Sequence, residues 1–234
     1  YHVYPRGVNR QCIFVDQRDR IFFLRSLVRA CRSGDLGVVA YALMSNHVHL
    51  VLLRGQYELG LGMKSLLGRY AQYFNRRHER SGHLFQQRYG ASLCDTDAYL
   101  VHLIRYVHAN PVRAGIAATP ADYPYSSYRW YARGRWPRWA ASEFVASSFG
   151  TDRALRRFFT ATDCDADRRE VDAHAERAGA PRPDRRVLSQ RDAGPRLVAS
   201  DAGEAPHLRA LQEAIEGARG LEPGALCGRR STRE

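Results

Sequence analysis

Strand-like and helix-like hydrophobic patterns alternate along the first 110 residues, which leaves few folds open to this chain. Apolar residues at helical spacing predict helices at residues 19–33, 61–77 and 97–110. Extended segments are expected at residues 2–15, with a turn near 6–9, and at residues 38–44, 47–53 and 84–93. Strands and helices in this mixed order predict an α+β sandwich built on an antiparallel sheet.

The two central extended segments predict a hairpin. Residues 38–44 form the longest unbroken apolar run, and Ser45 and Asn46 are typical of a turn leading into residues 47–53. A run of this length fits a buried strand but is far too short to cross a bilayer. We therefore expect no membrane association.

Charge is distributed unevenly along the chain. The formal net charge is +12, and residues 1–139 contain 20 basic and 8 acidic residues, whereas residues 140–234 contain 16 of each. A basic surface concentrated on one part of a protein favours a polyanionic partner, most often nucleic acid. The alternative explanation is an arginine-rich proteome, since Lys64 is the one lysine among 36 basic residues.

The five cysteines are scattered along the chain and form no CxxC pair. An odd number at long spacing argues against a disulfide framework and against a structural zinc site. This pattern is typical of a reducing compartment, so we expect the protein to be cytoplasmic.

Two histidines, His47 and His49, lie two residues apart in the returning strand of the hairpin. Side chains at this spacing project from the same face of a strand, so both imidazoles point together while Val48 enters the core. Two adjacent imidazoles can hold a divalent metal ion. The alternative is a structural role on the polar face of a half-buried strand.

The helix expected at residues 97–110 begins near Asp95 or Thr96, either of which can cap it, and is expected to end at Pro111. One face of it is apolar, and a separate polar stripe includes Tyr106 and Asn110, which stack on adjacent turns. Of the 13 tyrosines, Tyr106 alone has Asn or Gln four residues later. The alternative is a helix that merely has a polar edge.

Six segments in a fixed order carry a more specific pattern. They are Tyr1–Val3 with Arg6 and Gly7, Tyr41–Leu50, Gly68–Arg77, Gly82–Tyr89, Arg105–Gly115 and Tyr123–Tyr128. Together they resemble the REP-associated tyrosine transposases, a branch of the HUH single-tyrosine transposases that act on single-stranded DNA. The resemblance covers roughly residues 1–130.

The resemblance implies a ferredoxin-like or RRM-like sandwich, with a central antiparallel sheet and helices packed on it. Residues 1–135 would form the HUH catalytic domain. Residues 136–234 would form a helical or irregular, partly flexible C-terminal extension. Residues 208–230 faintly resemble the start of a helix-turn-helix, which the chain would leave truncated.

The implied activity is that of a metal-dependent single-stranded DNA transposase and endonuclease. It would nick and rejoin DNA beside palindromic hairpins through a 5′-phosphotyrosine intermediate, as a monomer or a homodimer. Tyr106 would be the nucleophile, and His47, His49 and Asn110 would hold Mg²⁺ or Mn²⁺. The residues expected to contact DNA phosphates are Arg69, Arg76, Arg77, Arg88, Arg105 and Arg113.

Two other functions remain open at this point. A domesticated hairpin-binding protein could keep the same residues without productive cleavage. An RNA-binding module is the third reading, because a sheet with exposed aromatic side chains can also stack RNA bases.

Overall fold

The computed structural model of the protein describes residues 1–87, 89–149 and 164–177, all of which belong to one compact unit. Its first half contains β1 (His2–Tyr4), α1 (Gln17–Arg32), β2 (Leu36–Leu43), β3 (Val48–Arg54), α2 (Leu59–Arg77), β4 (Gly90–Ser92) and α3 (Asp97–Arg113). The remaining elements are the short 3-10 helices η1 (Val8–Arg10) and η2 (Pro120–Asp122), and the helices α4 (Tyr128–Arg133), α5 (Ser142–Phe149) and α7 (Cys164–Arg177).

The four strands form one antiparallel sheet in the order β2-β3-β1-β4. Strands and helices that alternate as β1-α1-β2-β3-α2-β4 in this spatial order form a ferredoxin-like sandwich, which confirms the fold expected from the sequence. In the β2–β3 hairpin, Ala42 lies opposite His49 and Leu43 opposite Val48. In the β1–β3 pair, His2 lies opposite Val51.

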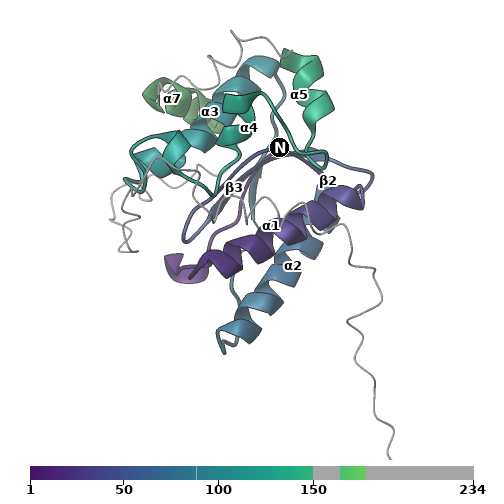
Figure 1. Ribbon diagram of the computed structural model, residues 1–234, viewed down its shortest axis with the longest axis vertical. Helices are drawn as coiled ribbons and strands as arrows, with labels where there is room; N and C mark the ends of the chain where they lie inside the picture. Colours follow the sequence, from purple (N-terminus) through teal and green to yellow (C-terminus); the bar gives the residue numbers. More distant parts are fainter. Residues whose placement is uncertain (88, 150–163, 178–234) are drawn as a thin grey trace, which may run out of the picture. The chain divides into compact units, whose positions relative to one another are not determined.

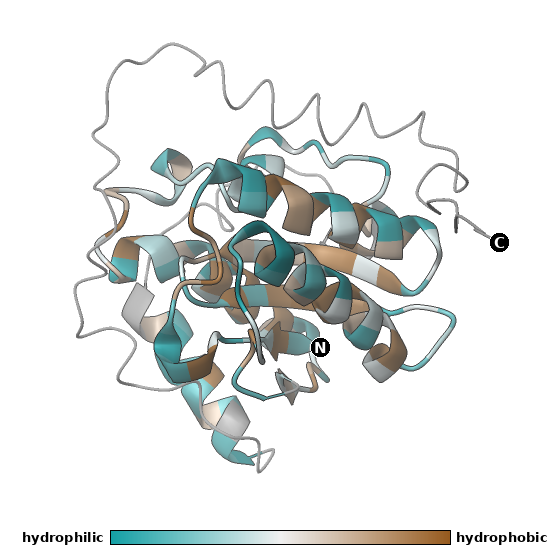
Figure 2. Ribbon diagram, turned by 90° about the horizontal axis from the view of Figure 1, so that it is seen from below, coloured by the Kyte–Doolittle hydropathy of each residue, from teal (hydrophilic) through white to brown (hydrophobic). Residues whose placement is uncertain are grey.

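The sheet separates two helical layers (Figure 1): α1 and α2 cover one face, and α3, α4, α5 and α7 lie on the other. In Figure 2 the helices are banded teal and brown, whereas the strands are largely brown. This is the pattern of amphipathic helices that bury one face against an apolar sheet. Asp16 is the N-cap of helix α1, and its carboxylate accepts from the backbone N–H groups of Arg18 and Asp19 at 2.8 and 3.3 Å.

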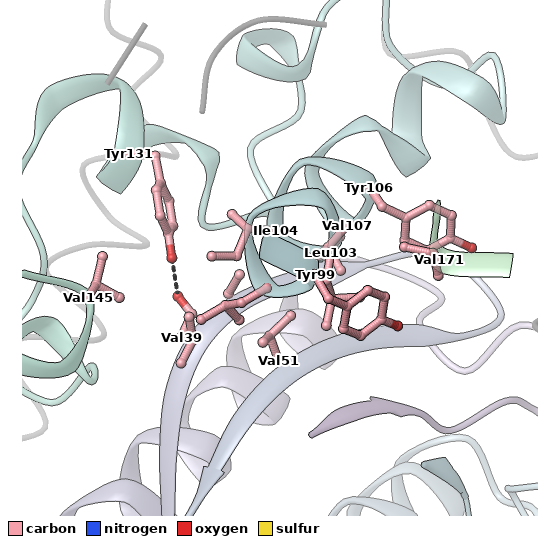
Figure 3. Close-up of a cluster of buried hydrophobic side chains, with 13 residues drawn as sticks. Val39, Val51, Tyr99, Leu103, Ile104, Tyr106, Val107, Tyr131, Val145 and Val171 are labelled. Carbon is pink, nitrogen blue, oxygen red and sulfur yellow. Dashed lines mark hydrogen bonds between the residues drawn. The ribbon is translucent and has the colours of Figure 1, made fainter. Parts of the chain in front are cut away.

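A core cluster on the α3 side of the sheet joins strand, helix and C-terminal residues (Figure 3). Val39 and Val51 come from the sheet, Tyr106 and its neighbours come from α3, and Val171 comes from α7. The hydroxyl of Tyr131 donates to the backbone carbonyl of Val39 at 3.0 Å. Helix α3 is therefore fixed between the sheet and α7.

Two of the predicted extended segments are shorter in the structure than expected. From residues 2–15 only β1 is a strand, and from residues 84–93 only β4. After β1 the backbone N–H groups of Gly7 and Ile13 donate to the carbonyls of Asn46 and Ser45, in the turn of the hairpin. The prediction of a second strand ending near Val15 is wrong because these donors are satisfied by loop carbonyls instead of by a neighbouring strand.

Helix α3 also runs past the residue at which it was expected to end. Pro111 lies inside the helix, which continues to Arg113. Proline has a helical φ but lacks the N–H group that would donate to the carbonyl four residues earlier, so the helix loses one hydrogen bond at this position. Backbone N–H groups beyond it restore the pattern, because Ala114 donates to the carbonyl of Asn110 and Ile116 donates to that of Pro111.

The C-terminal extension contributes two described helices, α5 and α7. Ala140 bridges Val38 of β2, so the chain beyond residue 135 continues along the same sheet. That residues 1–135 form the catalytic domain stays a prediction. The expected helix-turn-helix at residues 208–230 lies outside the described residues, as does the segment expected to be flexible. Within the described ranges, no helix is long and apolar enough to cross a membrane.

Candidate nuclease site

The strand-borne histidines lie at the start of β3. His47 forms an isolated bridge with Arg6, and His49 lies opposite Ala42. Their ring centroids are 5.0 Å apart with the ring planes at 85°. Both residues are buried, with 3% and 4% of their surface exposed. The structure therefore brings the two imidazoles together, as the spacing predicted.

Tyr106 reaches the same place from α3. Its ring centroid is 5.6 Å from that of His49, with the planes at 87°, and 6% of its surface is exposed. The guanidinium of Arg113 lies over the Tyr106 ring at 5.1 Å. Asn110, one turn further along α3, is also buried, and its Nδ2 donates to the Tyr106 carbonyl at 2.8 Å.

A third histidine completes the cluster from β1. His2 is 1% exposed, and its Nε2 lies 3.0 Å from Nδ1 of His49. The two rings are nearly parallel, at 20° and 5.3 Å, and the His2 ring meets Tyr106 edge-on at 6.0 Å. No sequence pattern singles out His2 as a site residue, because its place beside His49 depends on how β1 pairs with β3.

Burial sets the protonation of the cluster. It lowers the pKa of His47 to about 3 and holds the pKa of His49 well below its usual value, so both imidazoles are neutral near pH 7. Burial also raises the pKa of the Tyr106 phenol, while the nearby Arg113 charge acts in the opposite direction. Neutral imidazoles are competent metal ligands, whereas the phenol needs activation before it can act as a nucleophile.

The donor atoms suit a divalent cation. Nδ1 of His47 is engaged by Oδ1 of Asn46 at 2.6 Å, and Nδ1 of His49 by Nε2 of His2 at 3.0 Å, so Nε2 is the nitrogen outside these contacts in each imidazole. Asn110 uses Nδ2 toward the backbone and keeps Oδ1. Imidazole nitrogens bind divalent transition-metal ions, and an amide oxygen is a donor that Mg²⁺ and Mn²⁺ favour. Across the described ranges, no group of three or more His, Cys, Asp or Glu is arranged to hold a metal ion.

The six arginines expected to contact DNA have different surroundings. Arg69 and Arg76 are exposed on α2, and Arg113 lies over Tyr106. Arg77 forms ion pairs with Asp16 and Asp19, and Arg105, 8% exposed, pairs with Asp167 at 3.1 Å. Arg88 lies outside the described residues. Arg77 and Arg105 are thus engaged by carboxylates within the fold, and contact of the six arginines with DNA stays a prediction.

Helix α7 packs against the outer side of α3. The Asp167 carboxylate, 2% exposed, lies 2.9 Å from Nδ1 of His102, and the His174 ring stacks on Tyr99 at 3.6 Å. Val171 is buried beside Tyr106 in the core cluster. No sequence pattern pairs α7 with α3, since the segment between them carries no signal of where α7 docks.

The Arg77 pair belongs to a buried polar group that joins α1 to α2. The Asp19 side chain is 0% exposed and lies 2.5 Å from Nη1 of Arg77 and 3.1 Å from Nε2 of His78. It also accepts the Val15 backbone N–H at 2.8 Å. A carboxylate buried this completely is costly to leave without its full set of donors.

Asp19→Asn is expected to lower the free energy of unfolding by about 2 kcal/mol, because a neutral amide offers one acceptor oxygen where the carboxylate offers two. Urea denaturation measures the loss. Asp16→Asn is the matched control: its side chain is 44% exposed, and asparagine is an equally good N-cap, so the expected loss is below about 1 kcal/mol. An equal loss of unfolding free energy in the two variants would contradict the conclusion that the buried Asp19 carboxylate needs its full set of donors.

Comparison with known proteins finds one family match and one similar solved structure. Residues 1–110 match the model of a family described as IS200-like transposases, which confirms the resemblance over those residues. A solved structure of a REP-associated tyrosine transposase bound to a REP hairpin is similar to this chain, with 18% sequence identity and a TM-score of 0.46. That likeness covers 58% of this chain and 81% of the other. No curated protein matches the chain.

Proposed function

We propose that this chain, whose residues 1–110 match the IS200-like transposases, is a DNA strand transferase that nicks and rejoins single-stranded DNA beside a hairpin. The observation that carries the proposal is the meeting of His47, His49 and Tyr106 within one buried cluster. Two of these residues come from a strand and one from a helix more than 50 residues later along the sequence. Nothing in the packing of an ordinary core requires three titratable rings to meet there.

In the proposed reaction, Tyr106 is the nucleophile. The phenol loses its proton, its oxygen forms a bond to the scissile phosphorus, and the bond from phosphorus to the 3′-oxygen breaks. That oxygen takes up a proton and leaves as a free 3′-OH, while the 5′ phosphate stays on Tyr106. The reverse attack by a 3′-OH rejoins a strand, so no energy source is needed.

His47, His49 and Asn110 are the proposed ligands of Mg²⁺ or Mn²⁺. A cation held there would polarise the scissile phosphate and offset the charge that develops on it. Arg113, which lies over the Tyr106 ring, supports the phenolate electrostatically. Burial excludes bulk water from the cluster. This strengthens the attraction between the cation and the phosphate and that between Arg113 and the phenolate.

The DNA itself is proposed to lie partly along α2. This helix carries no acidic residue in its 19 positions, and Lys64, Arg69 and Arg76 are exposed on it. No hydrogen bond or ion pair holds these three side chains within the described parts of the chain. Gly68, exposed between them, has no atom within 4 Å of the position that a Cβ would occupy. A glycine within a helix costs stability, so this open position favours close approach of a ligand backbone.

Arg69→Gln/Arg76→Gln is expected to weaken hairpin binding and to reduce the slope of log affinity against log salt by about 1.5 to 2, because each of the two arginines is proposed to neutralise one phosphate. Fluorescence anisotropy over a salt series measures both quantities. Arg25→Gln/Arg29→Gln, which removes the same charge from exposed positions on α1, should change the slope much less. A slope that is equal in the two double variants would count against a DNA track on α2.

Intact-mass spectrometry tests the function as a whole. The protein is incubated with Mn²⁺ and the palindrome neighbouring its gene, carrying single-stranded flanks. The expected result is a mass increase equal to the mass of the 5′-phosphorylated DNA fragment less one water molecule, because the phosphate is joined to the tyrosine oxygen as a diester. Hairpin binding without an adduct across divalent metals would favour a domesticated binding protein. Tighter binding to RNA than to the matching DNA hairpin would favour an RNA-binding module.

A further inference from the structure

Each of the two proposed histidine ligands has a neighbouring side chain that contacts Nδ1 of its imidazole. The imidazole of His47 touches Asn46, and that of His49 touches His2. We infer that Asn46 and His2 are positioning residues that hold these two imidazoles with Nε2 free for a cation, an inference that rests on the proposed function. Neither residue would touch the cation or the DNA.

The orientation of Asn46 follows from its second contact. Its Nδ2 lies 3.2 Å from the backbone carbonyl oxygen of Arg10, and a carbonyl can only accept. The amide nitrogen therefore faces Arg10, and Oδ1 faces Nδ1 of His47 at 2.6 Å. Because Oδ1 can only accept, Nδ1 of His47 must carry the hydrogen and Nε2 keeps its lone pair.

The Arg10 carbonyl is itself held in an unusual loop. Asn9 and Arg10 have φ angles of 51° and 59°, a left-handed conformation that non-glycine residues rarely adopt. The N–H of Arg10 donates to the Gly7 carbonyl at 3.1 Å, which keeps the turn closed. Backbone strain of this kind persists only where surrounding contacts determine it, and here it places the acceptor for Asn46.

His2 performs the same task for His49. The two nitrogens, 3.0 Å apart, share one hydrogen, so one ring donates and the other accepts. If His49 accepted, its Nε2 would carry the hydrogen and could not bind a cation. If His49 donates from Nδ1, its Nε2 is free. The arrangement that serves the site therefore has His2 as the acceptor.

The backbone holds His2 firmly in this role. Residue 2 is paired on both sides, with Val51 of β3 and with Ser92 of β4. Its ring is 1% exposed and packs between His49 and Tyr4, with centroids 5.3 and 5.1 Å away. A second contact that fixes the tautomer of a metal-binding histidine is commonly worth about 10-fold to 100-fold in metal affinity.

The test measures metal affinity and tautomer directly. In His2→Leu the acceptor is removed, and Mn²⁺ affinity measured by calorimetry on the full chain is expected to fall by roughly 10-fold to 100-fold. His2→Gln places an amide oxygen near the position of Nε2 and should restore most of that affinity. Asn46→Ala is expected to weaken Mn²⁺ binding as His2→Leu does.

His108→Leu is the matched control for the removal of a buried imidazole. His108 is 2% exposed, lies on α3 between Tyr106 and Asn110, and bonds to the Ser127 hydroxyl at 2.8 Å. It contributes nothing to the two histidine ligands, so its removal should leave Mn²⁺ affinity close to that of the unaltered protein. An equal fall in affinity in His108→Leu and His2→Leu would overturn the inference.

Long-range ¹H–¹⁵N spectra of the metal-free, unaltered protein give an answer even if a leucine variant fails to fold. The expected spectra show His47 and His49 protonated on Nδ1, and protonation of His49 on Nε2 would refute the role of His2. Adduct formation is scored separately. A fall in affinity in His2→Leu without any adduct in the unaltered protein would refute the proposed function alone, whereas an adduct with unchanged affinity would refute this inference alone.

Discussion

Tyr106→Phe is expected to abolish the covalent protein–DNA adduct and to leave hairpin binding nearly unchanged. The substitution removes one oxygen atom and keeps the ring, so the contacts with His49, His2 and Arg113 persist. Without that oxygen no bond to phosphorus can form at this position. Intact-mass spectrometry after incubation with Mn²⁺ and the hairpin measures the adduct, and anisotropy measures binding.

Tyr99→Phe is the matched control. Tyr99 lies on the same helix, and in Figure 3 its ring points the same way as that of Tyr106. Burial raises the pKa of both phenols, so neither is favoured by acidity alone. Position relative to the imidazoles distinguishes them, because it is Tyr106 that contacts the rings of His49 and His2. An adduct that survives in Tyr106→Phe and disappears in Tyr99→Phe would identify Tyr99 as the nucleophile.

Two short-range periodicities were enough to predict most of the candidate site. The two-residue period of a strand put His47 and His49 on one face, and the helical period put Tyr106 and Asn110 in one stripe. Both predictions depend only on residues within one element. The structure agrees with each, and it adds the fact that strand and helix meet at a ring distance of 5.6 Å.

Contacts between distant elements could not be predicted in this way. His2 reaches His49 across 47 residues, and only the register of β1 against β3 decides that they touch. Arg77 reaches Asp19 across 58 residues. A sequence shows that a side chain is charged, but it does not show whether the partner is a carboxylate of the same chain or a phosphate. Arg77 and Arg105, which the sequence predicts to contact DNA, both lie beside carboxylates of the chain in the structure.

The predicted boundaries of the first extended segment were wrong for a related reason. The segment after β1 has the apolar content of a strand, but the backbone N–H groups of Gly7, Ile13 and Phe14 bond to the turn at Ser45 and Asn46. The same bonding holds the loop that carries the Arg10 carbonyl beside Asn46. Arg10, which the sequence predicts to lie in an extended segment, is therefore part of the loop that positions Asn46.

His47→Ala and His49→Ala are each expected to slow adduct formation by about 10³-fold, which corresponds to the several kcal/mol that a cation contributes at a developing phosphate charge. Either change removes one of the two imidazole nitrogens and leaves a set too small to hold Mg²⁺ or Mn²⁺ tightly. Single-turnover rates measured over a range of Mn²⁺ concentrations should show that excess metal restores part of the activity.

That partial recovery separates the removal of a ligand from a failure to fold. His108→Ala removes an equally buried imidazole from α3, so it matches the cavity and the loss of stability without touching the proposed ligands. Its rate should remain near that of the unaltered protein and should not respond to added Mn²⁺. If His47→Ala and His49→Ala behave in the same way as His108→Ala, the two imidazoles have a structural role and strand transfer does not depend on a cation held by β3.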